Sequence, residues 1–172
     1  PNNRNRILAV GVLILIYEFF MRVPLVNGWG DGSFELQDNF IRYIDILIFG
    51  EAHLYGGTGI PFDPEGFLST LPAVVTLMSG FWLGEYLLRP IKHQEKLTNL
   101  SVIGICLFMI GSILGLYEPI NKQLWTISYV LVMDGLAILV VVFSSFMIDV
   151  KKLDFWIKPA IVFGSNALVV FV

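Results

Sequence analysis

Residues 125–148 read WTISYVLVMDGLAILVVVFSSFMI, and this run decides the fold. Asp134 is its only charged residue. The hydrocarbon core of a bilayer is about 30 Å thick, and a helix of about 20 mainly apolar residues crosses it. The run therefore predicts a transmembrane helix.

Three further stretches meet the same length criterion, and a fifth apolar run begins near Pro159 and continues to the last residue. The chain is 56% hydrophobic and 15% charged, whereas soluble domains average about 25% charged residues, so a soluble enzyme domain is excluded. We predict an all-α, polytopic transmembrane helix bundle with four complete spans and a truncated fifth. The predicted spans of this single domain fragment, 1–172, are 7–26, 66–88, 98–117, 125–148 and 159–172.

The distribution of basic residues predicts the topology. Eight Lys and Arg residues lie before the first span and in loops 89–97 and 150–158, namely Arg4, Arg6, Arg89, Lys92, Lys96, Lys151, Lys152 and Lys158. The opposite loops contain Arg42 and Lys122. Because cytoplasmic loops are enriched in Lys and Arg, loops 89–97 and 150–158 are predicted to be cytoplasmic and loop 27–65 to lie outside the cytoplasm.

The charge and cysteine content exclude two classes of partner. The net charge is −3, which provides no basic surface for a nucleic acid. The single cysteine, Cys106, has no Cys/His cluster with metal-ligand spacing around it. We therefore expect no nucleic-acid partner and no metal.

The outer loop 27–65 is acidic and too long to be a simple connection. Phe40, Ile44, Leu47 and Ile48 fall on one face of a helix, while Asp38, Arg42 and Asp45 lie three or four residues apart. This pattern predicts a short amphipathic helix at the membrane interface.

Ionisable residues gather between this helix and the second span. His53 can exchange a proton near neutral pH, and a carboxylate can orient it. Asp63 and Glu65 stand just before the predicted span. A site built from His53, Asp63 and Glu65 is one reading. The other is that the two acids complement a helix dipole and that His53 makes an interfacial hydrogen bond.

Two carboxylates, Glu18 and Asp134, lie within predicted spans. Intramembrane acids are costly and indicate a polar cavity or a proton path. The alternative is a hydrogen bond to a neighbouring helix or, for Glu18, an ion pair with Arg22. Two GxxxG patterns, Gly80–Gly84 and Gly111–Gly115, predict close helix packing.

An ordered set of motifs in this chain resembles the heparan-α-glucosaminide N-acetyltransferase family, whose prokaryotic members include DUF5009-like membrane proteins. The set covers nearly the whole chain. It comprises Tyr43-Ile44-Asp45, Gly50, His53-Leu54-Tyr55, Asp63-Pro64-Glu65-Gly66, Asn121-Lys122-Gln123-Leu124-Trp125-Thr126 and Phe163-Gly164-Ser165-Asn166-Ala167.

The resemblance implies an integral membrane acyltransferase that carries an acetyl group from acetyl-CoA to an amino-sugar or glycan acceptor across the membrane. The chain resembles the C-terminal half of this fold, so the implied partners are the missing N-terminal half, the lipid bilayer and the acceptor, with a homo-oligomer left open. The family's catalytic histidine belongs to the missing half. The implied location is a bacterial inner membrane, with loop 27–65 periplasmic.

The resemblance also bears on the candidate residues. His53, Asp63 and Glu65 match family motif positions and are expected to orient the acceptor or the catalytic base. Tyr55, Asn121 and Asn166 are expected to contact substrate, although helix capping is an equal alternative for the two asparagines. Two other functions are retained: a transporter or flippase in which Glu18 and Asp134 bind protons or cations, and a packing module without catalytic activity.

Overall fold

The computed structural model describes residues 3–22, 26, 29, 32–153, 155 and 157–166. Within them the chain is helical and carries a single isolated β-bridge, between Val26 and Trp29, which confirms the all-α class for this part of the chain. The elements are α1 (Asn3–Arg22), α2 (Phe40–Phe49), the 3-10 helix η1 (Glu51–His53), α3 (Thr70–Leu87), α4 (His93–Leu114), α5 (Ile127–Ser145), the π-helix η2 (Phe146–Val150) and α6 (Ile157–Ser165).

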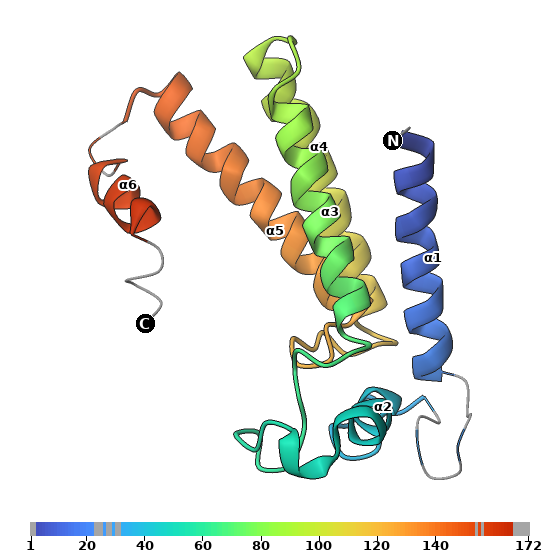
Figure 1. Ribbon diagram of the computed structural model, residues 1–172. Helices are drawn as coiled ribbons and strands as arrows, with labels where there is room; N and C mark the ends of the chain where they lie inside the picture. Colours follow the sequence, from blue (N-terminus) through green and yellow to red (C-terminus); the bar gives the residue numbers. More distant parts are fainter. Residues whose placement is uncertain are drawn as a thin grey trace.

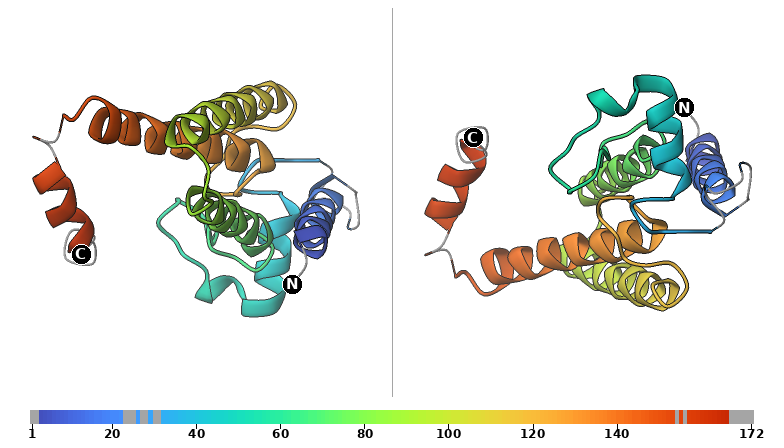
Figure 2. Two further views of the ribbon diagram at one scale, coloured as in Figure 1. Left: turned by 90° about the horizontal axis from the view of Figure 1, so that it is seen from above. Right: turned by 90° about the horizontal axis from the view of Figure 1, so that it is seen from below.

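The long helices stand side by side, with α3 packed against both α1 and α5, and α4 packed along α5 (Figure 1). Segment 32–69, here called the outer lobe, lies at one end of this group together with the α4–α5 turn. The start of α1 and the α3–α4 loop lie at the other end. The loops thus alternate between two ends as predicted, and which end faces the cytoplasm stays a prediction. Figure 2 shows α6 standing apart from the other helices.

Two of the described helices are long and apolar enough to cross a membrane, His93–Leu114 and Ile127–Val150. Helices α1 and α3 are not among them: α1 carries several charged residues, and α3 contains Pro72 and Glu85. The spans predicted at 7–26 and 66–88 therefore stay predictions. The fifth is represented by α6, and residues 167–172 of that prediction lie outside the described residues.

Helices α4 and α5 approach each other through glycine. A Cβ atom placed on Gly135 would lie 2.6 Å from the backbone nitrogen of Phe108, and one on Gly111 would lie 2.7 Å from that of Val132. The predicted packing role is thus confirmed for Gly111. For Gly80 and Gly84 it stays a prediction, because an added Cβ there would have no neighbour within 4 Å among the described residues.

The amphipathic helix predicted in the outer loop is α2, and its predicted position at the membrane interface stays a prediction. Phe40, Ile41 and Asp45 are buried, whereas Leu47 and Ile48 are 68% and 52% exposed. The first turn of α2 packs into the core while its last turn projects from it. Asp45 faces inward because it accepts a backbone hydrogen bond from the segment before α3.

The largest apolar core joins the outer lobe to the ends of α1 and α5. The Tyr17 hydroxyl of α1 crosses it and donates a hydrogen bond of 3.0 Å to the Leu124 carbonyl. This core fixes the lobe on the helix ends. Its buried members are Tyr17, Met21, Phe40, Ile41, Phe62, Leu68, Leu124 and Ile127.

Candidate functional site

The outer lobe is held together by Arg42. Its Nε donates to the Pro61 carbonyl at 2.8 Å and its Nη1 to the Gln37 carbonyl at 2.9 Å. Its Nη2 lies 3.2 Å from Glu51 Oε1, and the guanidinium stacks over the Trp29 ring. The rigid fork of donors on one arginine thus ties together separate segments of the lobe.

A second polar anchor joins α2 to the segment before α3. Asp45 has no exposed surface, and its Oδ1 accepts a hydrogen bond of 2.8 Å from the Phe67 backbone N–H. A Cβ on Gly66 would lie 1.9 Å from Asp45 Oδ2, so only glycine fits there. Burial raises the pKa of Asp45, the Phe67 N–H opposes this shift, and the charge of Asp63 adds to it. Two sequence motifs, Tyr43–Asp45 and Asp63–Gly66, therefore meet in space.

The three predicted site residues share the outer lobe but do not form a hydrogen-bonded group within the described part of the chain. His53 ends η1 and is exposed, and Glu65 is also exposed. Asp63 is half-buried, and its Oδ1 accepts the Glu65 backbone N–H at 2.9 Å. Asp63 thus shapes a turn that precedes α3, whereas the capping alternative is wrong, because α3 begins at Thr70 after the N-cap Ser69 and has no acidic residue in its first turn. This hydrogen bond uses Oδ1 of Asp63, and its Oδ2 is the atom that could bind a substrate.

The predicted substrate contacts lie in different places. Tyr55 is 59% exposed on the lobe. Asn121 accepts the backbone N–H of Gln123 at 2.8 Å and so closes a local turn, while the N-cap of α5 is Thr126. Asn166 is exposed at the end of α6, where its Nδ2 donates to the Val162 carbonyl.

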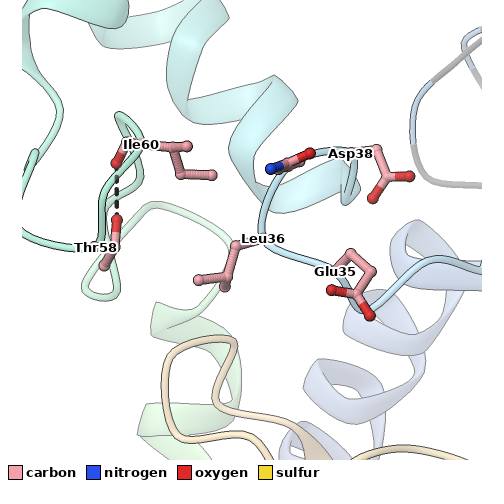
Figure 3. A pocket seen from close by; sticks show the side chains of 6 residues that line it. Glu35, Leu36, Asp38, Thr58 and Ile60 are labelled. Atoms are coloured by element: carbon pink, nitrogen blue, oxygen red, sulfur yellow. Dashed lines mark hydrogen bonds between the residues drawn. The ribbon is translucent and has the colours of Figure 1, made fainter.

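The outer lobe contains a cavity of about 400 Å³. Segments 35–38 and 58–60 face each other across it, and the Thr58 hydroxyl donates to the Ile60 carbonyl at 2.7 Å (Figure 3). Carboxylates and an amide can bind the hydroxyl and ammonium groups of a polar ligand. The cavity is lined by Glu35, Leu36, Gln37, Asp38, Thr58 and Ile60.

A second cavity, of about 420 Å³, lies among the long helices toward the opposite end. Its lining is mostly apolar, with Glu85 and Arg89 among the charged residues, and Arg6 Nη1 lies 2.9 Å from Glu85 Oε1. Ser79, which also lines it, is the α3 residue that faces the buried Asp134 of α5. The remaining lining residues are Asn3, Ile7, Trp82, Leu83, Tyr86, Leu100, Ile103, Leu107 and Ile138.

Sequence reasoning missed Glu118, which lies in the α4–α5 turn with no exposed surface. Its Oε1 accepts the Ile127 backbone N–H at 2.6 Å, and its Oε2 accepts a 3.2 Å bond from Arg22. Arg22 also pairs with Glu18 at 2.5 Å, the alternative foreseen for Glu18. The sequence signal that could have found Glu118 is an acidic residue in the short segment between two apolar runs.

A heparan-alpha-glucosaminide N-acetyltransferase of Mus musculus is 34% identical over 193 aligned residues, which cover 96% of this chain and 29% of the mouse protein. The protein of the same name from Homo sapiens is 30% identical over 147 residues, covering 76% of this chain and 22% of its own length. No family model matches the sequence.

These matches make the chain a homologue of N-acetyltransferases. The family is that of the heparan-alpha-glucosaminide N-acetyltransferases, and the homology extends over nearly the whole of this chain. The resemblance predicted from the motifs is thereby confirmed. The chain spans less than a third of the length of these two relatives.

Proposed function

We propose that this chain forms part of an integral membrane N-acetyltransferase that moves an acetyl group from acetyl-CoA to an amino-sugar or glycan acceptor across the membrane. The observation that carries the proposal is the 34% identity to such an enzyme over 96% of the chain. The two apolar helices α4 and α5 support a membrane location. The proposed membrane is a bacterial inner membrane, with the outer lobe on its periplasmic side.

The outer lobe supplies the acceptor side in this proposal. Its cavity presents the Glu35 and Asp38 carboxylates, which suit an ammonium or hydroxyl group. His53, Asp63 and Glu65 belong to the same lobe, and we assign them to orienting the acceptor or the base that deprotonates it. Exposure of His53 and Glu65 leaves both accessible to a ligand that enters from the solvent.

The cavity among the long helices supplies the donor side. Its apolar walls suit the acyl-pantetheine arm of the thioester, and Arg89 offers a cation for phosphate groups at the end that we predict to be cytoplasmic. Tyr86 packs beneath the Arg89 guanidinium, 5.3 Å from ring centroid to Arg89 Cζ. The donor and acceptor would thus enter from opposite ends of one helix group, and transfer requires the thioester carbon and the acceptor nitrogen to meet between the two cavities.

The chemistry is nucleophilic acyl transfer. The acceptor nitrogen forms a bond to the acetyl carbonyl carbon, a base takes the nitrogen's proton, and the C–S bond breaks to release CoA as the thiol after protonation. Positioned donors stabilise the tetrahedral oxyanion. The family resemblance implies a catalytic histidine in a part of the protein outside this chain, so His53 is assigned an orienting role.

The proposed partners are the lipid bilayer, the remaining N-terminal part of the enzyme, the sugar acceptor and, for an oligomer, a second copy of the chain. Cysteine substitution can locate the two ends in sealed vesicles. On a Cys106→Ser background, Thr58→Cys in the lobe and Lys152→Cys after η2 should react with a membrane-impermeant maleimide from opposite sides. Labelling of both from one side would refute the proposed topology.

The activity test uses the full-length protein in vesicles with labelled acetyl-CoA and a panel of amino sugars. Asp63→Ala and Glu65→Ala should each lower acetyl transfer at least tenfold while the amount of folded protein is unchanged. Glu95→Ala, which removes an exposed acid from the first turn of α4, is the matched control. Wild-type transfer rates in both lobe variants would remove these acids from the mechanism. Accumulation of unmodified substrate in the vesicles would favour a transporter.

A further inference from the structure

Two carboxylates and one guanidinium meet where α1 reaches the α4–α5 turn. The Glu118 carboxylate accepts the Ile127 N–H at 2.6 Å and an Arg22 bond at 3.2 Å. The second carboxylate is that of Glu18, whose Oε2 accepts the Arg22 Nε bond at 2.5 Å. If both acids are ionised, one positive charge faces two negative charges, and Glu118 has no contact with solvent.

The hydrogen-bond pattern lacks one donor. Glu18 Oε1 is buried and has no hydrogen-bond partner among the residues that the structure describes. Both carboxylates bind the same Arg22 guanidinium, Glu18 at Nε and Glu118 at Nη2, so the two acids face each other across it. Two facing carboxylates can form a hydrogen bond with each other only when one of them carries a proton. A proton held between the two acids would therefore supply the missing donor and remove the excess charge.

The other groups around Glu118 do not replace that proton. From α1, Tyr17, Glu18 and Arg22 face it, and the Tyr17 hydroxyl already donates to the Leu124 carbonyl. From α5, the facing group is the Ile127 N–H. Burial, with the charge of Glu18 next, raises the pKa of Glu118 to about 7, while the Ile127 N–H and Arg22 act in the opposite direction.

We propose that Glu18 and Glu118 form a proton-binding site that ties α1 to the start of α5 and releases its proton as the pH rises. When the proton leaves, the two carboxylates compete for Arg22 and repel each other, so the contact weakens. The folded chain binds this proton more tightly than the unfolded chain does. Its contribution to stability is therefore fully present below the ordinary pKa of glutamate, about 4.3, and is lost as the pH rises through about 7.

Infrared spectroscopy of the full-length protein tests the site directly, because a protonated carboxyl group has its own C=O stretching band. The wild-type protein should show a carboxyl band that disappears around pH 7. Glu118→Gln should lack it. Glu85→Gln should retain it, and it is a matched control since Glu85 forms the Arg6 ion pair at the opposite end of α1. A wild-type protein without such a titrating band overturns the proposal, as does a band unchanged by Glu118→Gln.

Thermal unfolding between pH 5.5 and pH 8.5 gives the second readout. The wild-type and Glu85→Gln proteins should lose stability over this interval, and Glu118→Gln, which keeps an acceptor for Ile127 without the charge, should lose less than half as much. An equal loss in all three proteins overturns the proposal. If Glu118→Gln does not fold, Glu18→Gln and the wild-type infrared titration decide the question, and neither readout depends on acetyl transfer.

Discussion

The outer lobe and the α4–α5 helix pair are stabilised by different interactions. In the lobe, polar side chains bind backbone groups: Arg42 holds the Gln37 and Pro61 carbonyls, and Asp45 holds the Phe67 N–H. In the helix pair, glycines bring two backbones into contact with few polar groups between them.

The difference follows from where each region gets its hydrogen bonds. A helix satisfies its own backbone groups, so α4 and α5 need only shape complementarity. The lobe is largely irregular chain, whose backbone groups require partners from side chains. A substitution should therefore destabilise the lobe most where it removes a hydrogen-bond partner of the backbone. It should destabilise the helix pair most where it adds side-chain volume.

The largest effect is expected from Gly66→Ala. The new Cβ would lie 1.9 Å from Asp45 Oδ2, so Asp45 must leave its site. We expect a loss of about 4 kcal/mol, the range of severe steric and buried-polar defects, measured by unfolding in detergent. Gly56→Ala, where an added Cβ has no neighbour within 4 Å, should change stability by less than about 1 kcal/mol. Equal stability of the two variants would contradict the Asp45–Gly66 contact.

Gly135→Ala tests the helix pair in the same way. Its Cβ would lie 2.6 Å from the Phe108 nitrogen, which forces α4 and α5 apart. Overpacking costs about 1–3 kcal/mol, and hydrogen exchange should increase in both helices while the lobe stays protected. The control is Gly84→Ala in α3, which meets no neighbour within 4 Å. A lobe that loosens together with the helix pair would show that the two regions are not separable.

Arg42→Lys separates charge from geometry. Lysine keeps the positive charge but cannot reach the Pro61 and Gln37 carbonyls and Glu51 together. We expect about 2 kcal/mol of destabilisation, since the charge-assisted hydrogen bonds to the Pro61 and Gln37 carbonyls are lost, with faster hydrogen exchange confined to segments 35–39 and 58–62. The α4–α5 pair serves as the internal reference. Unchanged exchange in the lobe would mean that charge alone is sufficient.

Asp45→Asn should have the smallest effect and one that depends on pH. The amide keeps an acceptor for the Phe67 N–H and removes a charge that is costly to bury. Because the pKa of Asp45 is raised in the fold, its aspartate form costs stability as the pH rises. Between pH 4 and pH 8 the free energy of unfolding of the variant should therefore rise by about 1 kcal/mol relative to that of the wild type. Unfolding curves of the two proteins at each pH measure this difference. Parallel curves would contradict the raised pKa.

Sequence patterns predicted the helical class, the two-ended arrangement of loops and the existence of α2, because hydrophobic length and spacing are local properties. They could not show that Asp45 turns inward, because its partner, the Phe67 N–H, lies far along the chain. The same reason hid Glu118, whose partners lie on α1 and α5. His53, Asp63 and Glu65 were placed on one lobe by motif order, but their relative orientation depends on turns that no periodicity encodes.

The way Arg42 holds the lobe bears on how this region can change during evolution. Two of its hydrogen bonds end on carbonyl oxygens, at Gln37 and Pro61, which every amino acid possesses. These bonds constrain the backbone beside the lobe cavity but not the side chains that line it. Substitutions in the lining can therefore alter which ligand the cavity binds while the backbone around it is kept. Ligand preference and folding stability of the lobe can thus change independently.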